Sequence, residues 1–521
     1  MKRRDFLHSL AAAGLLPLAP GFAPRALAAE GDTIRFAIAK PAGDMNPHAY
    51  NGLWGAQDLI FEPLMKYGAG GEIQPCLAAA WTLSDDGRAL ALELQQGVTF
   101  QDGAPWNAEA MKWNLDRWIP TGEHDWINHV RLFDRLEIKG DHSVVMHFKE
   151  APLSLFFELS YTRPTRYLSP TSVAADGSFA KAVGTGPWTM TSASDSLSAF
   201  ARYAGYWGPA PAFDKLELVV LPDSRSRMAA LRAGDIDVTG GDFMAPITAS
   251  EAATLKDAGI AVDVHSGTAM LLGFNPDRNP ALADPRVRKA ISQGFDRVAI
   301  AQVLYNGLAE PAGSMFPPSV PLSGSQFPPD AHDPEAARAL LEAAGWTGEG
   351  IRSKDGATLK VEFVVSNDQI AGSRNMAEVM QAQLAEIGID LTIRSVDHAS
   401  RHSDIPARHY DMALFLTFGA PYEPFGTMMG YLYSPYDNGV DGKMVINPAE
   451  LDPLMAAAAS ASEADVQQKL QAVYDWIHGG TALAPLLYTP SIWAHGARVE
   501  GFVPPATDYD TPYEGLSVKA G

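Results

Sequence analysis

Short runs of strand-forming residues alternate with stretches of helical periodicity along most of the chain. The clearest runs are residues 34–38, 216–221, 359–365 and 412–416. Each is rich in Val, Ile, Leu and Phe and is separated from the next by a helical pattern, which is typical of buried strands in a mixed architecture. The alternation predicts an α/β fold.

Three helices have clear end signals. A capping residue followed by proline, which suits the first helical turn, occurs at Asp333-Pro334 and at Asp284-Pro285. Gly345 supplies a C-terminal stop for the first of these helices, and Asn107 caps a third. We expect the helices to run from these caps through Ala344, Ile291 and Trp118.

Pieces rich in proline and glycine predict loops, because neither residue continues a helix or a strand easily. They cover residues 310–318, 321–329 and 419–426. The sequence shows no internal repeat and no low-complexity tract.

Composition limits the possible partners. The 521 residues are 46% hydrophobic, which is enough for a large core in two or three domains or a pair of lobes. The formal net charge is −21, with no Lys/Arg-rich run, so nucleic acid and anionic membranes are not expected partners. Cys76 is the single cysteine, which excludes an intramolecular disulfide and a cysteine-rich zinc site.

The N-terminus has the form of a secretory signal. Lys2-Arg3-Arg4 precedes the apolar stretch Leu10–Ala19 and the small-residue site Ala26-Leu27-Ala28. About ten mostly apolar residues cannot span a bilayer. Arg3-Arg4-Asp5-Phe6-Leu7 matches the twin-arginine pattern R-R-x-F-L. We expect residues 1–28 to be a twin-arginine signal peptide and the mature protein to work in a bacterial periplasm, without stable membrane insertion.

Sequence motifs of common enzyme sites are absent. The chain has no G-x-S-x-G, H-E-x-x-H, G-x-x-x-x-G-K-[ST] or G-x-G-x-x-G segment. We therefore expect a protein that is not an enzyme and that has no resident cofactor.

The densest histidine group is His398, His402 and His409, near Asp404 and Asp411. His398 and His402 are four residues apart and could share one face of a helix, as a zinc site requires. Hydrophilic residues lie between them, which favours an exposed surface helix. We predict no metal-ligating residues in the protein.

A series of motifs begins near residue 33 and continues in a fixed order. Its first members are Glu62-Pro63-Leu64 and residues 77–81, 94–103 and 107–114. The later members are residues 184–188, 206–208, 231–237, 284–291 and 384–389. In content and order these segments resemble the large extracytoplasmic solute-binding proteins of peptide and nickel ABC importers, known as family 5.

The resemblance implies a bilobal periplasmic-binding-protein fold of the large, type II-like form, with a ligand cleft and a hinge. Lobe one would comprise residues 29–265 and 488–521, and lobe two residues 266–487. Such a protein encloses a small ligand by hinge closure and presents it to an inner-membrane ABC permease. The resemblance also implies a monomer.

One motif distinguishes branches of this family. Peptide-binding members read G-A-D-Y where this chain reads Gly419-Ala420-Pro421-Tyr422, so the aspartate that pairs with a peptide ammonium group is replaced by proline. Nickel-binding members also read G-A-P-Y. The loop Glu123-His124-Asp125-Trp126 resembles their R-H-x-W, and Arg163 resembles the arginine of their L-P-R-P. Arginine suits a carboxylate-rich chelator, because its planar fork pairs bidentately with carboxylates.

Two departures from the nickel branch change the expected ligand. Glu123 replaces an arginine, so the pocket should reject a highly anionic chelate. The mobile-loop histidine that contacts the metal is missing, because no histidine lies between His409 and His478. An amino-acid-like or opine-like chelator would fit, with an ammonium group that could meet one of the nearby acidic residues Glu123, Asp125, Glu423 and Asp437.

Aromatic residues in the matched loops are candidates for the pocket walls. The predicted ligand-binding residues are Arg163, Tyr422, Trp126, His124, Glu123, Trp54, Phe418, Tyr436 and Tyr509. The predicted function is capture of nickel or another divalent metal as an organic chelate, which is cargo for the permease. Two alternatives stay open: a receptor for a metal-free peptide, opine or other amino-acid derivative, and a hydrolase or folding helper on the same scaffold.

Overall fold

A computed structural model describes residues 33–519, except for 153, 368–369, 371, 437–442, 445 and 462–463. The predicted signal peptide and Asp437 lie outside the described residues. The described residues belong to one compact unit.

The dominant feature is a mixed sheet in the order β17-β16-β18-β12-β19-β11-β1-β10-β9-β8, with β13 paired to β19. Its strands are β1 Thr33–Ile38, β8 Trp188–Ala193, β9 Leu197–Arg202, β10 Lys215–Val220, β11 Val238–Gly240, β12 Ala261–Phe274, β13 Glu310–Pro311, β16 Lys360–Val365, β17 Asp390–Ser395, β18 Met412–Leu416 and β19 Leu483–His495. A second sheet, β4-β5-β7-β6, contains β4 Ala78–Leu83, β5 Ala89–Leu94, β6 Phe133–Gly140 and β7 Ser143–Phe148.

Helices cover these sheets and connect their strands. The α-helices are α1 Trp54–Asp58, α2 Ala108–Trp118, α3 Asn128–Leu132, α4 Leu155–Glu158, α5 Ser224–Ala233, α6 Ala249–Asp257, α7 Pro285–Gln293, α8 Arg297–Tyr305, α9 Pro334–Ala343, α10 Ser373–Glu386, α11 His398–Asp404, α12 Phe425–Leu432, α13 Pro448–Ala459 and α14 Val466–Gly479. The predicted α/β class is confirmed.

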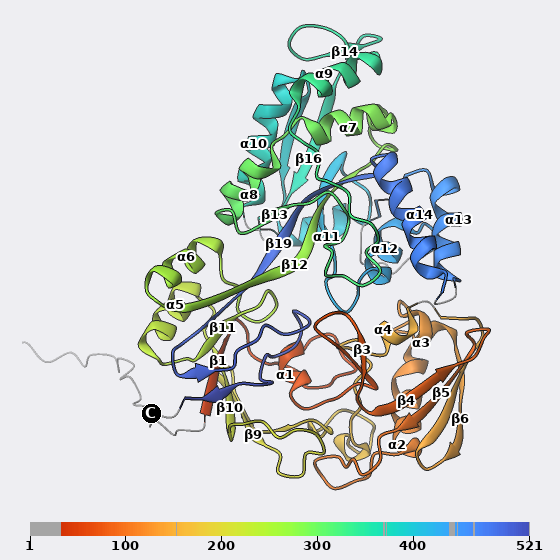
Figure 1. Cartoon of the computed structure of the whole chain (residues 1–521), viewed down its shortest axis with the longest axis vertical. Helices are drawn as coiled ribbons and strands as arrows, with labels where there is room; N and C mark the ends of the chain where they lie inside the picture. Colours follow the sequence, from red (N-terminus) through yellow and green to blue (C-terminus); the bar gives the residue numbers. More distant parts are fainter. Residues whose placement is uncertain are drawn as a thin grey trace, which may run out of the picture. The chain divides into compact units, whose positions relative to one another are not determined.

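Two long antiparallel strands, β12 and β19, run through the middle of the large sheet. β19 pairs with β11 at one end, and β12 pairs with β18 at the other. Figure 1 shows β12 and β19 extending from the group that contains β1 and β11 to the group that contains β16. The predicted lobe boundaries at residues 265 and 488 fall inside these two strands and stay a prediction.

The predicted helix caps are confirmed by side-chain hydrogen bonds. Asn107 accepts from Ala110 N, Asp284 from Arg286 N and Asp333 from Ala336 N. Each cap satisfies a backbone N–H group that has no partner within its helix.

Two of the predicted loops contain regular structure. β13 lies inside residues 310–318 because this backbone pairs with β19, a contact between segments far apart in sequence. α12 begins at Phe425, inside the predicted loop 419–426. Pro424 occupies its N-cap position, where a missing N–H group costs nothing.

The motif at residues 184–188 has a steric explanation. A Cβ atom on Gly184 would lie 2.0 Å from the carbonyl oxygen of Ile60, and Gly186 N donates to that same oxygen at 2.8 Å. Only glycine allows this approach. The turn directs Trp188 into the core, where it is fully buried.

The candidate ligand pocket

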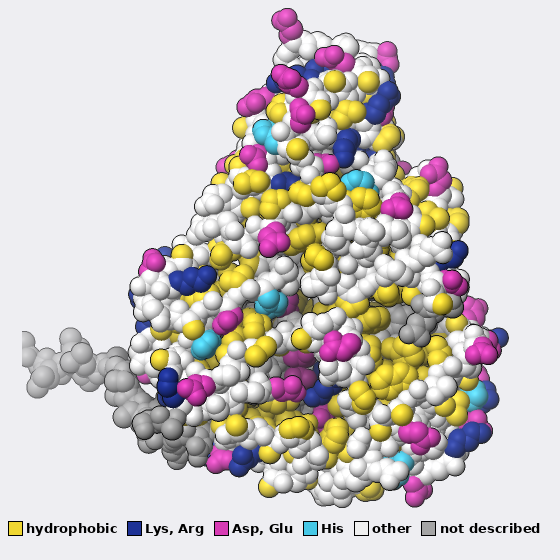
Figure 2. All heavy atoms as spheres, viewed as in Figure 1, with side chains coloured by type: hydrophobic (Ala, Val, Ile, Leu, Met, Phe, Trp, Pro, Cys, Tyr) yellow, Lys and Arg dark blue, Asp and Glu magenta, His cyan; other side chains and the backbone are white. Residues whose placement is uncertain are grey.

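Eight of the nine predicted ligand-binding residues line one cavity of about 710 Å³. They are Trp54, Glu123, Trp126, Arg163, Phe418, Tyr422, Tyr436 and Tyr509, joined by Tyr50, Asn128, Glu158, Tyr161, Gly426 and Met429. Figure 2 shows hydrophobic side chains gathered around α3 and α4, in the region facing α12. A volume of this size suits a small organic ligand.

Residues from distant parts of the chain build the walls. Trp54 begins α1, Trp126 precedes α3, and Arg163 follows α4. Phe418 follows β18, and Tyr509 belongs to the C-terminal segment after β19. The pocket therefore exists only in the folded chain.

The aromatic rings pack against each other. The ring centroids of Tyr161 and Tyr422 lie 4.4 Å apart, and Trp126 stacks on Tyr161 at 6.1 Å. Tyr509 meets Trp54 edge-on at 5.1 Å and stacks on Phe243 at 4.5 Å. These contacts fix the orientation of a largely apolar wall.

Tyrosine hydroxyls tie the walls together. The Tyr422 hydroxyl lies 2.9 Å from Thr162 Oγ1, and the Tyr509 hydroxyl donates to the Phe418 carbonyl at 2.7 Å. The Tyr436 hydroxyl donates to the Trp126 carbonyl. Each bond joins segments that are more than ninety residues apart, and it satisfies a polar group inside an apolar wall.

Among the described residues that line the pocket, Arg163 is the only arginine or lysine, and it is 2% exposed. Its terminal nitrogens donate to the carbonyls of Ala49 at 2.9 Å and Gly52 at 3.0 Å, and its guanidinium carbon lies 4.3 Å from the Trp54 ring centroid. No carboxylate among the described residues forms an ion pair with it. Burial lowers the pKa of Arg163 to about 10, so it stays charged at neutral pH.

The acidic candidates separate into different environments. Glu123 is exposed and lines the cavity, whereas Asp125 lines a neighbouring pocket. Glu423 is 1% exposed and does not line the cavity; its Oε1 accepts from Gly419 N at 3.0 Å. Glu158 lines the cavity, but its carboxylate accepts from Asn128 and His129. Among the described wall residues, Glu123 is thus the acid that remains available to a ligand.

His124 lies behind the wall and does not line the cavity. It is 1% exposed, and its Nδ1 lies 2.6 Å from the hydroxyl of Tyr50. Its predicted contact with the ligand stays a prediction, and the structure places Tyr50 between His124 and the cavity.

Comparison with known proteins identifies the chain. The family described as "Bacterial extracellular solute-binding proteins, family 5 Middle" matches residues 72–439. The nickel-binding periplasmic protein of Escherichia coli K12 is 30% identical over 409 residues, which cover 76% of this chain and 77% of that protein. This chain belongs to the family 5 solute-binding proteins.

Solved structures agree with this assignment. An ABC transporter substrate-binding protein from Sinorhizobium meliloti is 51% identical, with a TM-score of 0.86 over 94% of this chain and 100% of that one. NikA from Brucella suis, in complex with Fe(III)-EDTA, is 28% identical with the same TM-score and the same coverages. The bilobal binding-protein fold is confirmed.

This solute-binding protein is the substrate-binding component of an ABC importer of the family 5 type. Its relatives are transport proteins that bind solutes, not enzymes, and they work with ABC permeases. Within the described residues, no helix has the length and hydrophobicity needed to cross a membrane.

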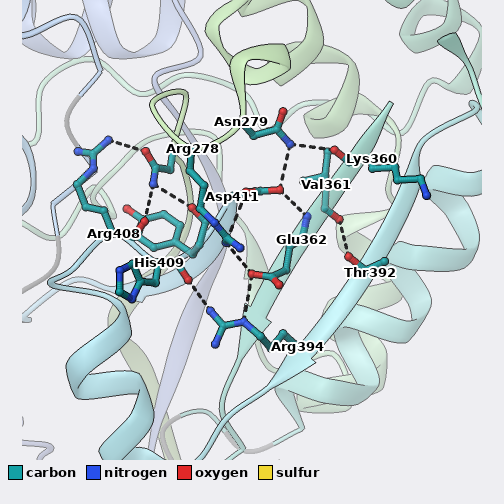
Figure 3. Close-up of polar contacts among 12 residues, drawn as sticks. Arg278, Asn279, Lys360, Val361, Glu362, Thr392, Arg394, Arg408, His409 and Asp411 are labelled. Atoms are coloured by element: carbon teal, nitrogen blue, oxygen red, sulfur yellow. Dashed lines mark hydrogen bonds and ion pairs between the residues drawn. The ribbon is translucent and has the colours of Figure 1, made fainter. Parts of the chain in front are cut away.

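The histidine group of the solute-binding protein lies at the surface around α11. The rings of His398 and His402 are 4.3 Å apart. Asp404 pairs with Arg394, and Asp411 accepts from Asn279 at 3.0 Å and from Glu362 N at 2.9 Å. Figure 3 shows the contacts of Asp411 with Asn279 and Glu362, and that of Arg394 with Glu362. In the part of the chain that the structure describes, no group of three or more His, Cys, Asp or Glu side chains could hold a metal ion.

Six residues of the cavity wall were not predicted from the sequence. Tyr161 stands two positions before Arg163, and Gly426 and Met429 closely follow the G-A-P-Y motif, so proximity to matched motifs was an available signal. Asn128 stands two positions after Trp126 and had the same signal, whereas Tyr50 and Glu158 had none. Their place in the wall depends on tertiary packing.

Burial of Glu423 predicts a pH dependence of stability. Desolvation raises the pKa of Glu423 from 4.5 to about 7, so the folded protein binds a proton that the unfolded chain releases above pH 4.5. Its contribution to stability is fully present below pH 4.5 and is lost as the pH rises through about 7, by about 3 kcal/mol.

Glu423→Gln, which cannot ionise, should remove this contribution. Urea unfolding of wild type and variant at several pH values between about 4.5 and 8 would measure it. As the pH rises, the free energy of unfolding of the variant should increase relative to that of wild type. Parallel curves for the two proteins would contradict the raised pKa.

Proposed function

We propose that this solute-binding protein captures nickel or another divalent metal inside an organic chelator and delivers it to the permease. The observation that carries the proposal is Arg163, a buried cation without a carboxylate partner among the described residues, in a cavity of mostly aromatic walls. A ligand carboxylate would supply the missing countercharge.

The chelator would provide nearly all of the metal coordination. The described wall residues include a single free acid, Glu123, and tyrosine hydroxyls that are already bonded to other residues. Such a wall suits recognition of an organic surface and lacks the compact donor set that binds a bare ion. The resemblance to nickel-binding relatives supports a metal-containing cargo.

The two charges in the wall favour an amino-acid-derived chelator. Arg163 lies deep in the wall, whereas Glu123 is exposed. A ligand with a carboxylate and an ammonium group would satisfy both, and a highly anionic chelate would be repelled by Glu123.

Enclosure of the ligand would follow the family's hinge mechanism. We propose residues 29–265 with 488–521 as one lobe and 266–487 as the other, acting as a monomer. β12 and β19 connect the two sets, so a small change in these strands would open or close the pocket.

Calorimetric titration with the metal, the chelators and their complexes tests the proposed cargo. Protein from its own periplasm would be dialysed and then titrated by calorimetry with free Ni²⁺, with Ni²⁺ plus free L-histidine, with Ni²⁺ plus an opine-type chelator, and with each chelator alone. We expect a chelate to bind at least about 100-fold more tightly than the bare ion, a difference of about 2.7 kcal/mol.

Two outcomes would contradict this prediction. The first is tight binding of bare Ni²⁺ that is lost in the double variant His398→Ala/His402→Ala. This result would place the metal site at the surface histidines, and binding there would weaken below about pH 6.5. Tight binding of a metal-free peptide or opine, with none of the chelates bound, would favour the alternative function.

Arg163→Ala tests the carboxylate contact. Loss of a desolvated charge pair should weaken chelate binding by about 2 to 4 kcal/mol. Arg163→Lys keeps the charge but loses the planar fork, so it should recover only part of the affinity.

Arg225→Ala, which removes an exposed arginine on α5, is the matched control and should bind like wild type. Circular dichroism would check that all three variants fold. Unchanged affinity in a folded Arg163→Ala variant would show that no ligand carboxylate meets this residue.

We also propose export by the twin-arginine route, on the basis of Arg3-Arg4-Asp5-Phe6-Leu7. Arg3→Lys/Arg4→Lys keeps the positive charge of the signal and should still leave unprocessed precursor in the cytoplasm. Fractionation and immunoblotting would measure precursor and mature protein. Normal processing of the double variant would indicate a different export route.

A further inference from the structure

The hydroxyl of Tyr50 is held between two partners. Trp126 Nε1 donates to it at 2.7 Å, and His124 Nδ1 lies 2.6 Å away on the other side. Tyr50 and Trp126 both line the cavity, whereas His124 is buried behind them. A buried ring that cannot touch the ligand therefore contacts a group that can.

Trp126, Tyr50 and His124 form a short series of hydrogen bonds, and its donors and acceptors depend on the protonation of His124. An indole N–H can only donate, so the Tyr50 oxygen accepts from Trp126. In the neutral tautomer that carries its proton on Nε2, His124 Nδ1 is an acceptor and the Tyr50 hydroxyl donates to it. One lone pair of the Tyr50 oxygen remains for the cavity.

The surroundings keep His124 neutral at neutral pH. Burial lowers its pKa, and this effect outweighs the attraction of Glu123 and Asp125 on the same loop. Across the ring, Trp118 packs at 5.7 Å between centroids.

Other charged groups lie nearby. Arg163 lies 5.8 Å from the Tyr50 ring centroid. Burial lowers the pKa of His48 to about 3, and Arg117 acts on it in the same direction, so His48 remains uncharged over the range in which His124 titrates.

We propose that His124 is a positioning residue of the pocket: it acts through the Tyr50 hydroxyl and determines whether that hydroxyl donates or accepts toward a ligand. The inference rests on the cavity proposed above as the ligand site.

Uptake of a proton by His124 would reverse the hydrogen bond. Both nitrogens of the imidazolium are donors, so Nδ1–H would donate to the Tyr50 oxygen. The Tyr50 hydroxyl proton would then turn to the cavity. The wall would gain a donor and a positive charge behind it, and both changes favour an anionic group of the ligand.

NMR spectroscopy of the full mature chain, labelled with ¹⁵N at histidine and tryptophan, tests this inference without a ligand. Spectra would be compared at about pH 7.5 and about pH 4, because burial lowers the pKa of His124 below its ordinary value. The His124 signals would be assigned with His124→Asn, and the Trp126 Nε1–H signal with Trp126→Phe.

The variants distinguish a positioning role of His124 from a role in packing alone. We expect an unprotonated Nδ1 at about pH 7.5 in wild type, and a Trp126 signal that moves with His124 as the pH falls. His124→Asn, whose amide oxygen can replace Nδ1 as acceptor, should keep the neutral-pH position of that signal and lose its pH dependence. His124→Leu and Tyr50→Phe should displace it at both pH values.

His398→Asn, a surface control, should leave the Trp126 signal unchanged. A protonated Nδ1 at about pH 7.5 would overturn the proposal, as would a Trp126 signal in wild type that does not depend on pH. If His124→Leu does not fold, the comparison of wild type with His124→Asn still decides the question.

A binding measurement tests the consequence for the ligand. Fe(III)-EDTA is a suitable probe, because it keeps its metal and its charge in weak acid. Wild type should bind it several-fold more tightly at about pH 4 than at about pH 6.5, and His124→Asn should lose this ratio. Equal ratios in the two proteins would overturn the proposed control of the ligand-facing hydroxyl. Absence of any chelate binding would count against the proposed function, and the NMR comparison would still decide the role of His124.

Discussion

The antiparallel pairing of β12 with β19 is the constraint on which the remaining structure depends. These strands stand at the centre of the large sheet and connect its two ends. β18, which leads into Phe418 and Tyr422, pairs with β12, and the segment that bears Tyr509 follows β19. A shift of one residue in this register would turn the buried side chains to the opposite face and displace two walls of the pocket.

Polar contacts stabilise this register. The hydroxyls of Thr268 on β12 and Thr489 on β19 lie 2.9 Å apart, and Thr417 accepts from Ala269 N at 2.8 Å. These contacts lie close to the register shift between Ser266 and Ala269 in the pairing of β12 with β19. Side-chain hydroxyls here pair with two backbone groups of β12: Thr417 accepts from Ala269 N, and Thr489 donates to the Thr268 carbonyl, as buried polar groups require.

The sequence predicted local features well because their causes are local. Asn107, Asp284 and Asp333 cap helices through groups two or three residues away, and these helices begin as expected. The motif around Gly184 is likewise specific, since only glycine fits against Ile60. β13 was missed because its existence depends on β19, which lies far away in sequence.

The same distinction applies to the pocket. Arg163, Tyr422 and Trp126 lie in motifs with recognisable neighbours, and the structure brings them to one cavity. His124 belongs to the same matched loop, but residue type and spacing cannot reveal which side of a wall a ring occupies. Glu158 was missed for a similar reason: its carboxylate is bonded to Asn128 and His129, a contact formed only when α3 meets α4.

Desolvation is the dominant electrostatic effect around the pocket. It lowers the pKa of Arg163 and of His124, and it raises that of Glu423, which has Asp508 rather than a cation nearby. A buried cation bonded only to carbonyl dipoles is costly, because dipoles replace lost hydration incompletely. The folded protein thus holds Arg163 in a state that an anionic ligand would relieve. Since the same burial excludes water around the incoming group, recognition by Arg163 would be strongest when the walls close over the ligand.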